Sequence, residues 1–478
     1  MNRKTHSARA AFDIRVTLRP LLPLVAALVL AGCASSAAID PARLPQAPAA
    51  FKENTAPVPA QTAAASQPQS QGTWWKAFAD PVLDDLVEKA GRNNNSVQVA
   101  AGRLAQARAI ARQTDANRSP QIGLGGGVSR GTDANAGNVP STVVSVGANL
   151  SYEVDLFGKL AGASNAASLD AVSREALLRS TRLLVQADVA QTYLNLRALD
   201  TERTLVRDTL QAYRNTLRLT EVRFREGDVA ELDLARVRAE VASTESEALA
   251  LDRSRAELEH ALAVLVGEAA STFAVAPVEW VMALPVIPAG VPSTVLERRP
   301  DIAAAQAGMQ AARARVGVAE TAWFPTFSLT ASGGYAAPEI GDLFKLSTRA
   351  WGIGALLSLP IFDGGRREAG VQGANAELDI ALANYREQVL VAFRDVEDQL
   401  SAIRLLADQA EAQSRSVAAA SRATLLSDSR YRNGLVSQLE LLDAQRIELR
   451  GRRQALQVRN AQYVAAVGLI RALGGGWA

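Results

Sequence analysis

The stretch Val144–Asp155, VSVGANLSYEVD, decides the fold of this chain. Valine, alanine, leucine and tyrosine occupy its even-numbered positions, while serine, glycine, asparagine and two acidic residues occupy the odd ones. Such alternation is typical of a strand with one apolar face and one polar face. A tilted strand needs about 10 residues to cross a membrane. The stretch therefore predicts a β-strand of membrane-spanning length.

Three further segments show the same alternation, and together the four predict two β-hairpins. The strands are expected at about 120–130, 142–156, 325–336 and 350–362. In the last of these, Leu359 and Ile361 continue the apolar row that begins at Trp351. One wall of a soluble sheet is the alternative, but the segments between the hairpins have a helical pattern and offer no strands to complete a sandwich.

A shift of 205 to 207 residues aligns the two halves of the chain. The segment Arg223–Gly227, RFREG, recurs as Arg430–Gly434, RYRNG. The chain is therefore predicted to hold two copies of one unit, which consists of a helix, two strands and a long helical hairpin. The first repeat is expected at 74–267, the inter-repeat segment at 268–297 and the second repeat at 298–478.

Long helices account for most of the remaining residues. Between about Ala161 and Phe224, leucine and alanine recur at seven-residue steps, which is coiled-coil spacing. At 1.5 Å per residue such a helix is about 95 Å long, too long for an ordinary globular core. Gly227 and Gly434 each follow a long helix, where glycine tolerates the positive φ of a C′ residue. We expect the hairpins to turn there, with second helices running to about Val266 and Leu473.

Four membrane strands cannot close into a barrel, because every unpaired edge amide in hydrocarbon costs several kcal/mol. Closure must come from further copies of the chain. Two copies give a small barrel filled with side chains, whereas three give a twelve-stranded barrel that begins to leave a passage. The rows of serine, glycine and asparagine favour a polar passage. We therefore expect an oligomeric tube, mainly α-helical, whose transmembrane β-barrel is continued by a helical barrel.

The amino terminus is predicted to be a lipoprotein signal peptide, residues 1–32. Its apolar core, Leu21–Ala31, is too short to span a bilayer as a helix. Leu30–Cys33, LAGC, resembles a bacterial lipobox, so Cys33 is expected to carry a diacylglycerol and an N-acyl chain such as palmitate. No other cysteine exists to pair with Cys33. Ala34, rather than aspartate, follows it and fits sorting to the outer membrane. Residues 33–73, rich in alanine, proline, glutamine and serine, are expected to form a lipidated tether.

Charge and composition exclude several function classes. The chain has 51 basic and 49 acidic residues, and the leader holds five of the basic ones and one acidic one, so 46 face 48 in the remainder. No electrostatic footprint for nucleic acid remains. With one cysteine and two histidines, a zinc site or a thiol nucleophile would depend on His260 almost alone, which argues against metallo- and thiol-enzymes. We expect no cofactor other than the covalent lipid.

Three motifs resemble those of the outer membrane factors, the TolC-like channels of tripartite efflux and secretion systems. They are WWKAFADPVLDDLVEKA (Trp74–Ala90), LPVIPAGVPSTVLERRPDI (Leu284–Ile302) and RYRNGLVSQLELLDAQR (Arg430–Arg446). The resemblance is to the lipoprotein branch that serves resistance-nodulation-division pumps. It implies a homotrimer in the outer membrane with a periplasmic α-barrel and an equatorial belt. It also implies a periplasmic adaptor and an inner-membrane pump as partners, and a passive exit duct for drugs or other small toxic compounds.

By position, the resemblance also implies a gate at the periplasmic hairpin turns. Glu440 and Asp443 match acidic constriction rings, and Leu439 and Arg446 match other constriction positions. Asp233, with a tyrosine equivalent to Tyr431, matches a contact that holds the tips closed, and Gly227 and Gly434 mark turns where an adaptor docks. Val436 replaces a basic gate residue of the best-known member, so that lock is not expected here. For Glu440 a capping box with Ser437 is the alternative, and for Asp443 a favourable place near a helix N-terminus.

Three other functions compete with an efflux duct. A periplasmic adaptor lipoprotein would also have a lipobox and a helical hairpin, but such adaptors generally carry one hairpin between β-rich halves. A type I secretion exit duct would share the channel architecture. An enzyme on a coiled-coil scaffold finds no support, because the chain shows no phosphate-binding loop, nucleophile elbow or histidine-based constellation.

Overall fold

The computed structural model describes residues 43–53, 73–132, 139–278, 280, 284–288 and 290–476. The predicted signal peptide and Cys33 lie outside these residues. The described residues group into two compact units. The first contains Ile110–Ser168 and Gln310–Ile380 together with Arg43, and the second contains Leu44–Ala109, Leu169–Met309 and the residues from Ala381 onward.

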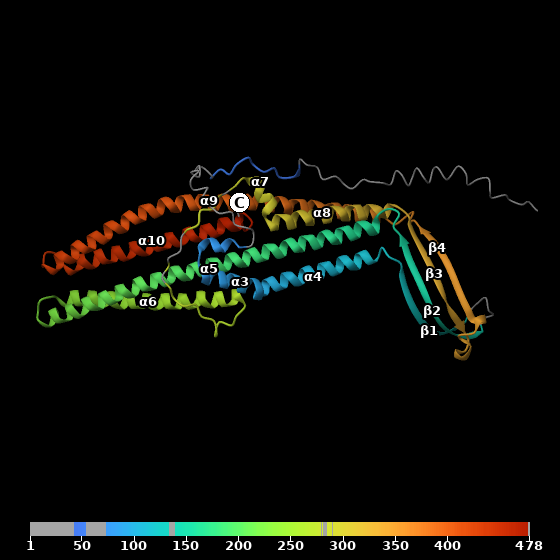
Figure 1. The fold of residues 1–478 in the computed structure, drawn as a ribbon, viewed down its shortest axis with the longest axis horizontal. Coiled ribbons are helices and arrows are strands. Elements are labelled where there is room, and N and C mark those ends of the chain that lie inside the picture. Colours follow the sequence, from blue (N-terminus) through green and yellow to red (C-terminus); the bar gives the residue numbers. More distant parts are fainter. Residues whose placement is uncertain are drawn as a thin grey trace, which may run out of the picture. The chain divides into compact units, whose positions relative to one another are not determined.

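The first unit is built on an antiparallel sheet of four strands in the order β1-β2-β3-β4 (Figure 1). The strands are β1 (Gln121–Thr132), β2 (Pro140–Val154), β3 (Thr326–Ala337) and β4 (Arg349–Ser358). Leu150 pairs with both Ile122 and Ala331, and Ala331 pairs with Ile353. Directly paired residues share a face, so the apolar rows of all four strands form one continuous apolar face. Glycine, serine, threonine and asparagine predominate on the opposite face, which also holds Val143 and Leu356.

The fourth strand is shorter than predicted. It ends at Ser358, so Leu359 and Ile361 lie outside the strand, and the prediction that they extend its apolar row is wrong. Pro360 stands between them and has no N–H to donate to a ladder, which explains the early end. The apolar row of β4 stops at Leu357.

The seam between β2 and β3 joins the two hairpins, and their backbones approach closely there. A Cβ on Gly147 would lie 2.9 Å from the carbonyl oxygen of Gly333. A Cβ on Gly334 would collide with the carbonyl oxygen of Val146 and lie 2.5 Å from the Cα of Gly147. Both positions therefore require glycine, for lack of space rather than for backbone conformation.

Each hairpin returns to a helix through a matching aspartate cap. The Asp155 carboxylate accepts hydrogen bonds from the backbone N–H groups of Leu160 and Ala161, at 3.1 and 2.7 Å. In the second hairpin, Asp363 accepts from the N–H groups of Gly365 and Arg367, at 3.1 and 3.2 Å. An aspartate near a helix start satisfies N–H groups that have no intrahelical partner.

Helices make up most of the rest of the described chain. They are α3 (Pro81–Asn93), α4 (Asn95–Ala116), α5 (Lys159–Arg225), α6 (Glu231–Val266), α7 (Pro292–Arg298), α8 (Pro300–Glu320), α9 (Arg366–Arg432) and α10 (Gln438–Ala472). Short 3₁₀ segments are η3 (Trp74–Phe78), η5 (Thr321–Trp323), η6 (Ile340–Asp342) and η7 (Leu346–Thr348). The helix α5 thus stands where the seven-residue pattern predicts a long helix, and α9 stands where the repeat predicts its equivalent. The pairs α5–α6 and α9–α10 form two hairpins. None of the described helices combines the length and the hydropathy needed to span a membrane.

The second unit holds the larger hydrophobic clusters. In one of them Trp74 and Phe78 pack against α5, α6 and α10. In the same cluster the ring centres of Tyr463 and of Trp280 in the inter-repeat segment lie 4.9 Å apart. Arg197 and Arg255 of the α5–α6 hairpin donate hydrogen bonds to the backbone carbonyls of Ala276 and Val275. The inter-repeat segment is therefore fixed to the first helical hairpin by both packing and charge-assisted hydrogen bonds.

A buried arginine fixes the start of the second repeat. Arg299, only 7% exposed, lies between α7 and α8. Its guanidinium forms ion pairs with Asp301 at 2.7 Å and with Asp395 of α9 at 3.2 Å, and it donates to the carbonyl of Ala472. Burial disfavours the charge of Arg299, but these partners outweigh burial and raise its pKa. One side chain thus connects α8, α9 and the end of α10.

Part of the predicted tether packs on the helices. The backbone N–H groups of Lys52 and Glu53 donate to the two carboxylate oxygens of Glu397 on α9, at 2.7 and 2.9 Å. Phe51 is buried in the cluster that contains Val389. The expectation that residues 33–73 form only a tether is therefore wrong for residues 51–53, which pack on the helices. Composition hid the contact, because one aromatic side chain among alanines and prolines gives no periodic signal.

Candidate gate at the helical hairpin turns

The two hairpins of the second unit turn at the predicted glycines. Gly227 and Gly434 have φ values of +84° and +70°. After α5, the N–H of Gly227 bonds to the carbonyl of Phe224, and that of Asp228 to the carbonyl of Arg223. After α9, Gly434 and Leu435 repeat this pattern with Tyr431 and Arg430. Both turns are Schellman motifs with glycine at C′.

Close to the turns, α5 contacts α9 and α10. The guanidinium of Arg223 donates to the Tyr431 hydroxyl at 3.2 Å and lies 5.6 Å from the centre of its ring. The amide of Gln438 donates to the hydroxyl of Thr220 at 2.9 Å, and both residues are buried. These contacts join the two turns within one protomer.

Further along the hairpins an ion pair joins α6 to α10. Arg446 donates from Nε to Glu240 at 2.8 Å, and its Nη1 lies 3.5 Å from Asp443. The hydrogen bond to Glu240 raises the pKa of Arg446. Burial, with Glu240 nearby, raises the pKa of Tyr213 to about 12, so this tyrosine stays neutral at physiological pH.

The predicted carboxylates stand beside these contacts. The Asp443 side chain is 55% exposed and faces Arg446 on its own helix. Glu440 donates its backbone N–H to the Ser437 hydroxyl at 3.3 Å, so the N-cap half of the alternative capping box is present. Asp233 lies 3.6 Å from Arg236, whereas the hydroxyl of Tyr431 bonds to Arg223. Leu439 is exposed on the first turn of α10.

Sequence reasoning missed the partners of these residues. It proposed roles for Arg446 and Tyr431 but did not identify Glu240 and Arg223 as their partners. Glu240 and Arg446 are separated by 206 residues, one fewer than the shift of 207 that aligns the turns of the two repeats. Opposite charges at that separation were the available signal, because equivalent helices of two adjacent hairpins run side by side.

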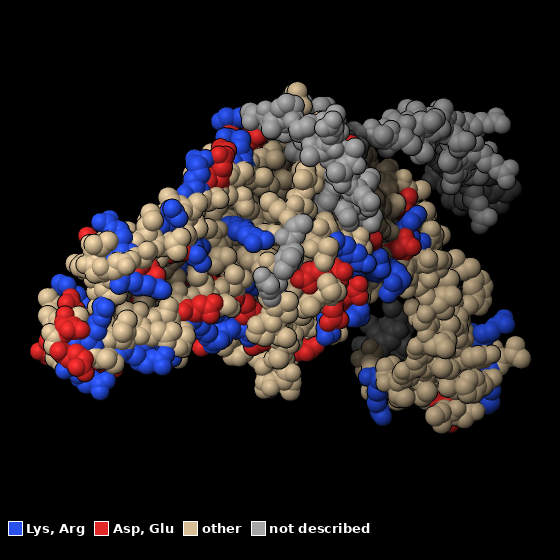
Figure 2. All heavy atoms as spheres, turned by 60° about the vertical axis from the view of Figure 1, so that its left-hand side comes forward, with Lys and Arg blue, Asp and Glu red and all other residues tan. Residues whose placement is uncertain are grey.

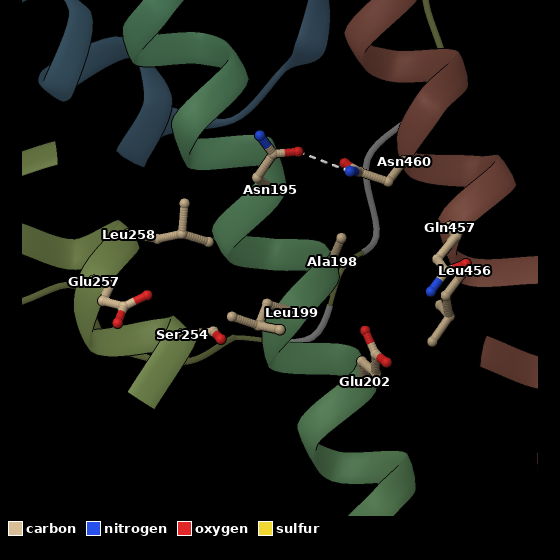
Figure 3. Close-up of a pocket in the computed structure, with 10 residues that line it drawn as sticks. All are labelled: Asn195, Ala198, Leu199, Glu202, Ser254, Glu257, Leu258, Leu456, Gln457 and Asn460. Atoms are coloured by element: carbon tan, nitrogen blue, oxygen red, sulfur yellow. Dashed lines mark hydrogen bonds between the residues drawn. The ribbon is translucent and has the colours of Figure 1, made fainter. Parts of the chain in front are cut away.

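A groove of about 430 Å³ opens between α5, α6 and α10 (Figure 3). At one end the amide of Asn460 donates to Asn195 at 2.7 Å, and Glu202 and Glu257 are among the lining residues. The Glu202 carboxylate accepts from Arg453. Within the described residues no cluster of histidine, cysteine, aspartate and glutamate is suited to hold a metal ion. Acidic and basic side chains mix over the surface of the helical hairpins (Figure 2).

Comparison with known proteins adds independent observations. The family described as "Outer membrane efflux protein" matches residues 86–268 and 291–475. The cation efflux system protein CusC of Escherichia coli O6:H1 is 31% identical over 470 residues, which cover 96% of this chain and 98% of CusC. The pyoverdine export outer membrane protein OpmQ of Pseudomonas aeruginosa is 35% identical over 419 residues, covering 84% and 87%.

Solved structures resemble this one over nearly its whole length. The Campylobacter jejuni CmeC outer membrane channel superposes with a TM-score of 0.86 at 26% identity, covering 93% of this chain and 95% of CmeC. The open state of the Neisseria gonorrhoeae MtrE outer membrane channel superposes with a TM-score of 0.78 at 28% identity, covering 90% and 98%. Strands, helical hairpins, family match and relatives agree, and the chain therefore belongs to the outer membrane efflux protein family, as an outer-membrane channel of an efflux system and a passive duct rather than an enzyme.

Proposed function

We propose that three copies of the chain form one continuous duct, with a twelve-stranded barrel in the outer membrane and a helical barrel in the periplasm. The observation that carries the proposal is the sheet of the first unit. Its apolar rows form one face, and within the described part of the chain its outer strands β1 and β4 each pair on one side only. Unpaired strand edges are not stable in hydrocarbon, so β4 of one copy must pair with β1 of the next.

The copy number is tested on the full chain purified in detergent. Light scattering is expected to give three times the mass of one chain, and planar bilayers that contain the protein are expected to conduct ions. A folded monomer, or an assembly that inserts without conducting, would contradict the trimeric duct.

The duct needs partners, because nothing in the family's architecture supplies energy. We propose that a periplasmic adaptor docks at the turns around Gly227 and Gly434, and that an inner-membrane pump of the resistance-nodulation-division type delivers the cargo. The named relatives serve cation efflux and pyoverdine export. For this chain the proposed cargo is drugs or other small toxic compounds. A diacylglycerol and an N-acyl chain on Cys33 would anchor each copy to the outer membrane.

The duct is proposed to narrow at the hairpin turns. Threefold repetition around an axis brings Asp443 and Glu440 of the three copies together, with Leu439 beside them. Arg446 is engaged by Glu240, so it neutralises Asp443 only in part. Concentrated negative charge favours cations over anions in a pore. Asp233, Tyr431 and Arg446 are proposed to set the resting position of the tips.

We expect Asp443→Ala to weaken cation selectivity in reconstituted channels. Removing three carboxylates from one ring should lower the permeability ratio of potassium to chloride about twofold or more, because an exposed ring acts through a screened potential. Reversal potentials across a salt gradient measure the ratio.

The control is Glu411→Ala, which removes an exposed carboxylate on α9 that pairs with Arg415 one turn away. It carries the same loss of charge at a place far along the chain from the turns. Equal selectivity in Asp443→Ala and the unmodified channel, or an equal change in both variants, would remove Asp443 from the constriction.

A further inference from the structure

The connection between β3 and β4 is an ordered loop, held by internal hydrogen bonds, with an apolar surface. It contains η6 and η7, and the hydroxyl of Thr348 donates to the carbonyls of Leu343 and Lys345 at 2.8 and 2.7 Å. Asp342 and Lys345 form an ion pair and neutralise each other. Three large side chains of the loop are nevertheless exposed, namely Ile340 at 78%, Phe344 at 74% and Leu346 at 84%.

The loop lies against the apolar face of the sheet. Tyr335 pairs with Val146, which places it in the apolar row. The ring of Phe344 makes an edge-on contact with Tyr335 at 5.6 Å between centres. At the end of the same row Ala337 is 1% exposed, and it is the one buried residue among the four strands. Leu343 of the loop is also buried.

The apolar face is the one that meets lipid, because a barrel in a membrane turns its apolar rows outward. Trp351 and Arg349 continue this face next to the loop, and both are exposed. Tryptophan and tyrosine collect where acyl chains meet headgroups, and arginine reaches from there to phosphate. On the side of the sheet visible in Figure 2, most side chains are uncharged, and the few basic and acidic ones lie towards its edges.

The level of the loop follows from chain order. The strands join helices at the ends near Gln121, Val154, Thr326 and Ser358, and the β3–β4 loop lies at the opposite end of the sheet. In a channel with a periplasmic helical part, that end lies at the outer leaflet.

From these observations we propose that the β3–β4 loop, Glu339–Thr348, is a lipid-binding element that inserts Ile340, Phe344 and Leu346 into the outer leaflet at the boundary between acyl chains and headgroups. Its occupant is the lipid surface, since the ring of Phe344 contacts Tyr335 in the apolar row and Ile340 and Leu346 are exposed in the same loop. The contact of Phe344 with Tyr335 lies on the apolar row, which argues against a loop folded over the lumen. The β3–β4 loop of each copy would thus anchor the barrel at a fixed depth in the membrane.

The test places a nitroxide label on the full-length chain in vesicles of phosphatidylethanolamine and phosphatidylglycerol. The label is attached to Leu346→Cys and, as the matched control, to Ala336→Cys. Ala336 is exposed and lies near the same end of the sheet as the loop, but it pairs with Ser145 on the polar face. The unmodified chain, labelled in parallel, measures any contribution of Cys33. Ile340→Cys is a second loop position in case Leu346→Cys assembles poorly.

Collision rates with oxygen, which dissolves in lipid, and with a water-soluble nickel complex report where the label lies. We expect the ratio of oxygen to nickel collisions to be severalfold higher at residue 346 than at residue 336. Equal ratios at the two positions would place the loop in water and overturn the proposal. Low collision rates with both reagents at residue 346 would show that protein covers the loop, and would also overturn it. The reading does not depend on how many copies close the barrel.

Discussion

Gly334→Val is expected to prevent assembly of the channel. Any side chain at this position points into the backbone of Val146 and Gly147, at the seam where β2 meets β3. Overpacking of this kind costs about 1–3 kcal/mol even where flexible side chains absorb it, and here the neighbour is backbone. Each copy contributes one seam to the barrel, so the cost recurs in every protomer.

The adjacent glycine provides a matched control. A Cβ on Gly333 meets no atom within 4 Å, and this residue lies in the apolar row. Gly333→Val therefore adds an apolar side chain on the lipid-facing side and should assemble normally. Electrophoresis of unheated outer membranes measures the assembled fraction of both variants. Similar assembly of Gly334→Val and Gly333→Val would refute the steric argument.

Arg299→Met is the second large expected effect. It leaves Asp301 and Asp395 facing each other without their shared cation, and their side chains are only 23% and 24% exposed. Removing one member of a buried ionic group typically costs about 3–5 kcal/mol. We expect a corresponding loss of unfolding free energy in denaturant titrations. Arg394→Met is the control, because Arg394 pairs with the same Asp395 from solvent and should change stability little.

The ion pairs of Arg299 with Asp301 and Asp395 also make the stability of the fold depend on pH in the acid range. Burial disfavours the charged form of Asp301, but its hydrogen bond and ion pair with Arg299 outweigh burial and lower the pKa of its carboxyl. A lowered pKa contributes stability that is complete above the unfolded value of about 4 and is lost as pH falls through the folded value. Stability of the unmodified chain should therefore fall below about pH 4, and less steeply in Arg299→Met. Parallel acid profiles would exclude Arg299 as the cause.

The sequence predicted the strands and the long helices because their signals repeat along the chain. Alternation in Val144–Asp155 and seven-residue steps before Phe224 each involve many residues, so a single exception does not hide them. The prediction of where β4 ends was wrong because one proline, Pro360, interrupts the strand although the residues around it are apolar. The docking of Phe51 was not predicted, because it depends on a single side chain and on a glutamate far away in the sequence.

In the candidate gate, too, features with a local sequence signal were predicted and contacts between distant residues were not. The turns were predictable, since glycine at C′ has a local cause in backbone conformation. The partners of Tyr431 and Arg446 were not, because they come from residues about two hundred positions away whose alignment depends on how the hairpins pack. The roles of Asp443 and Glu440 stay predictions, since they concern a ring made by several copies.

The pairing of α6 with α10 also bears on the history of the chain. Arg446 bonds to Glu240, but the positions that correspond to them in the other repeat, Ala239 and Ile447, hold no charge. A chain built from two copies of either half would therefore lack this ion pair.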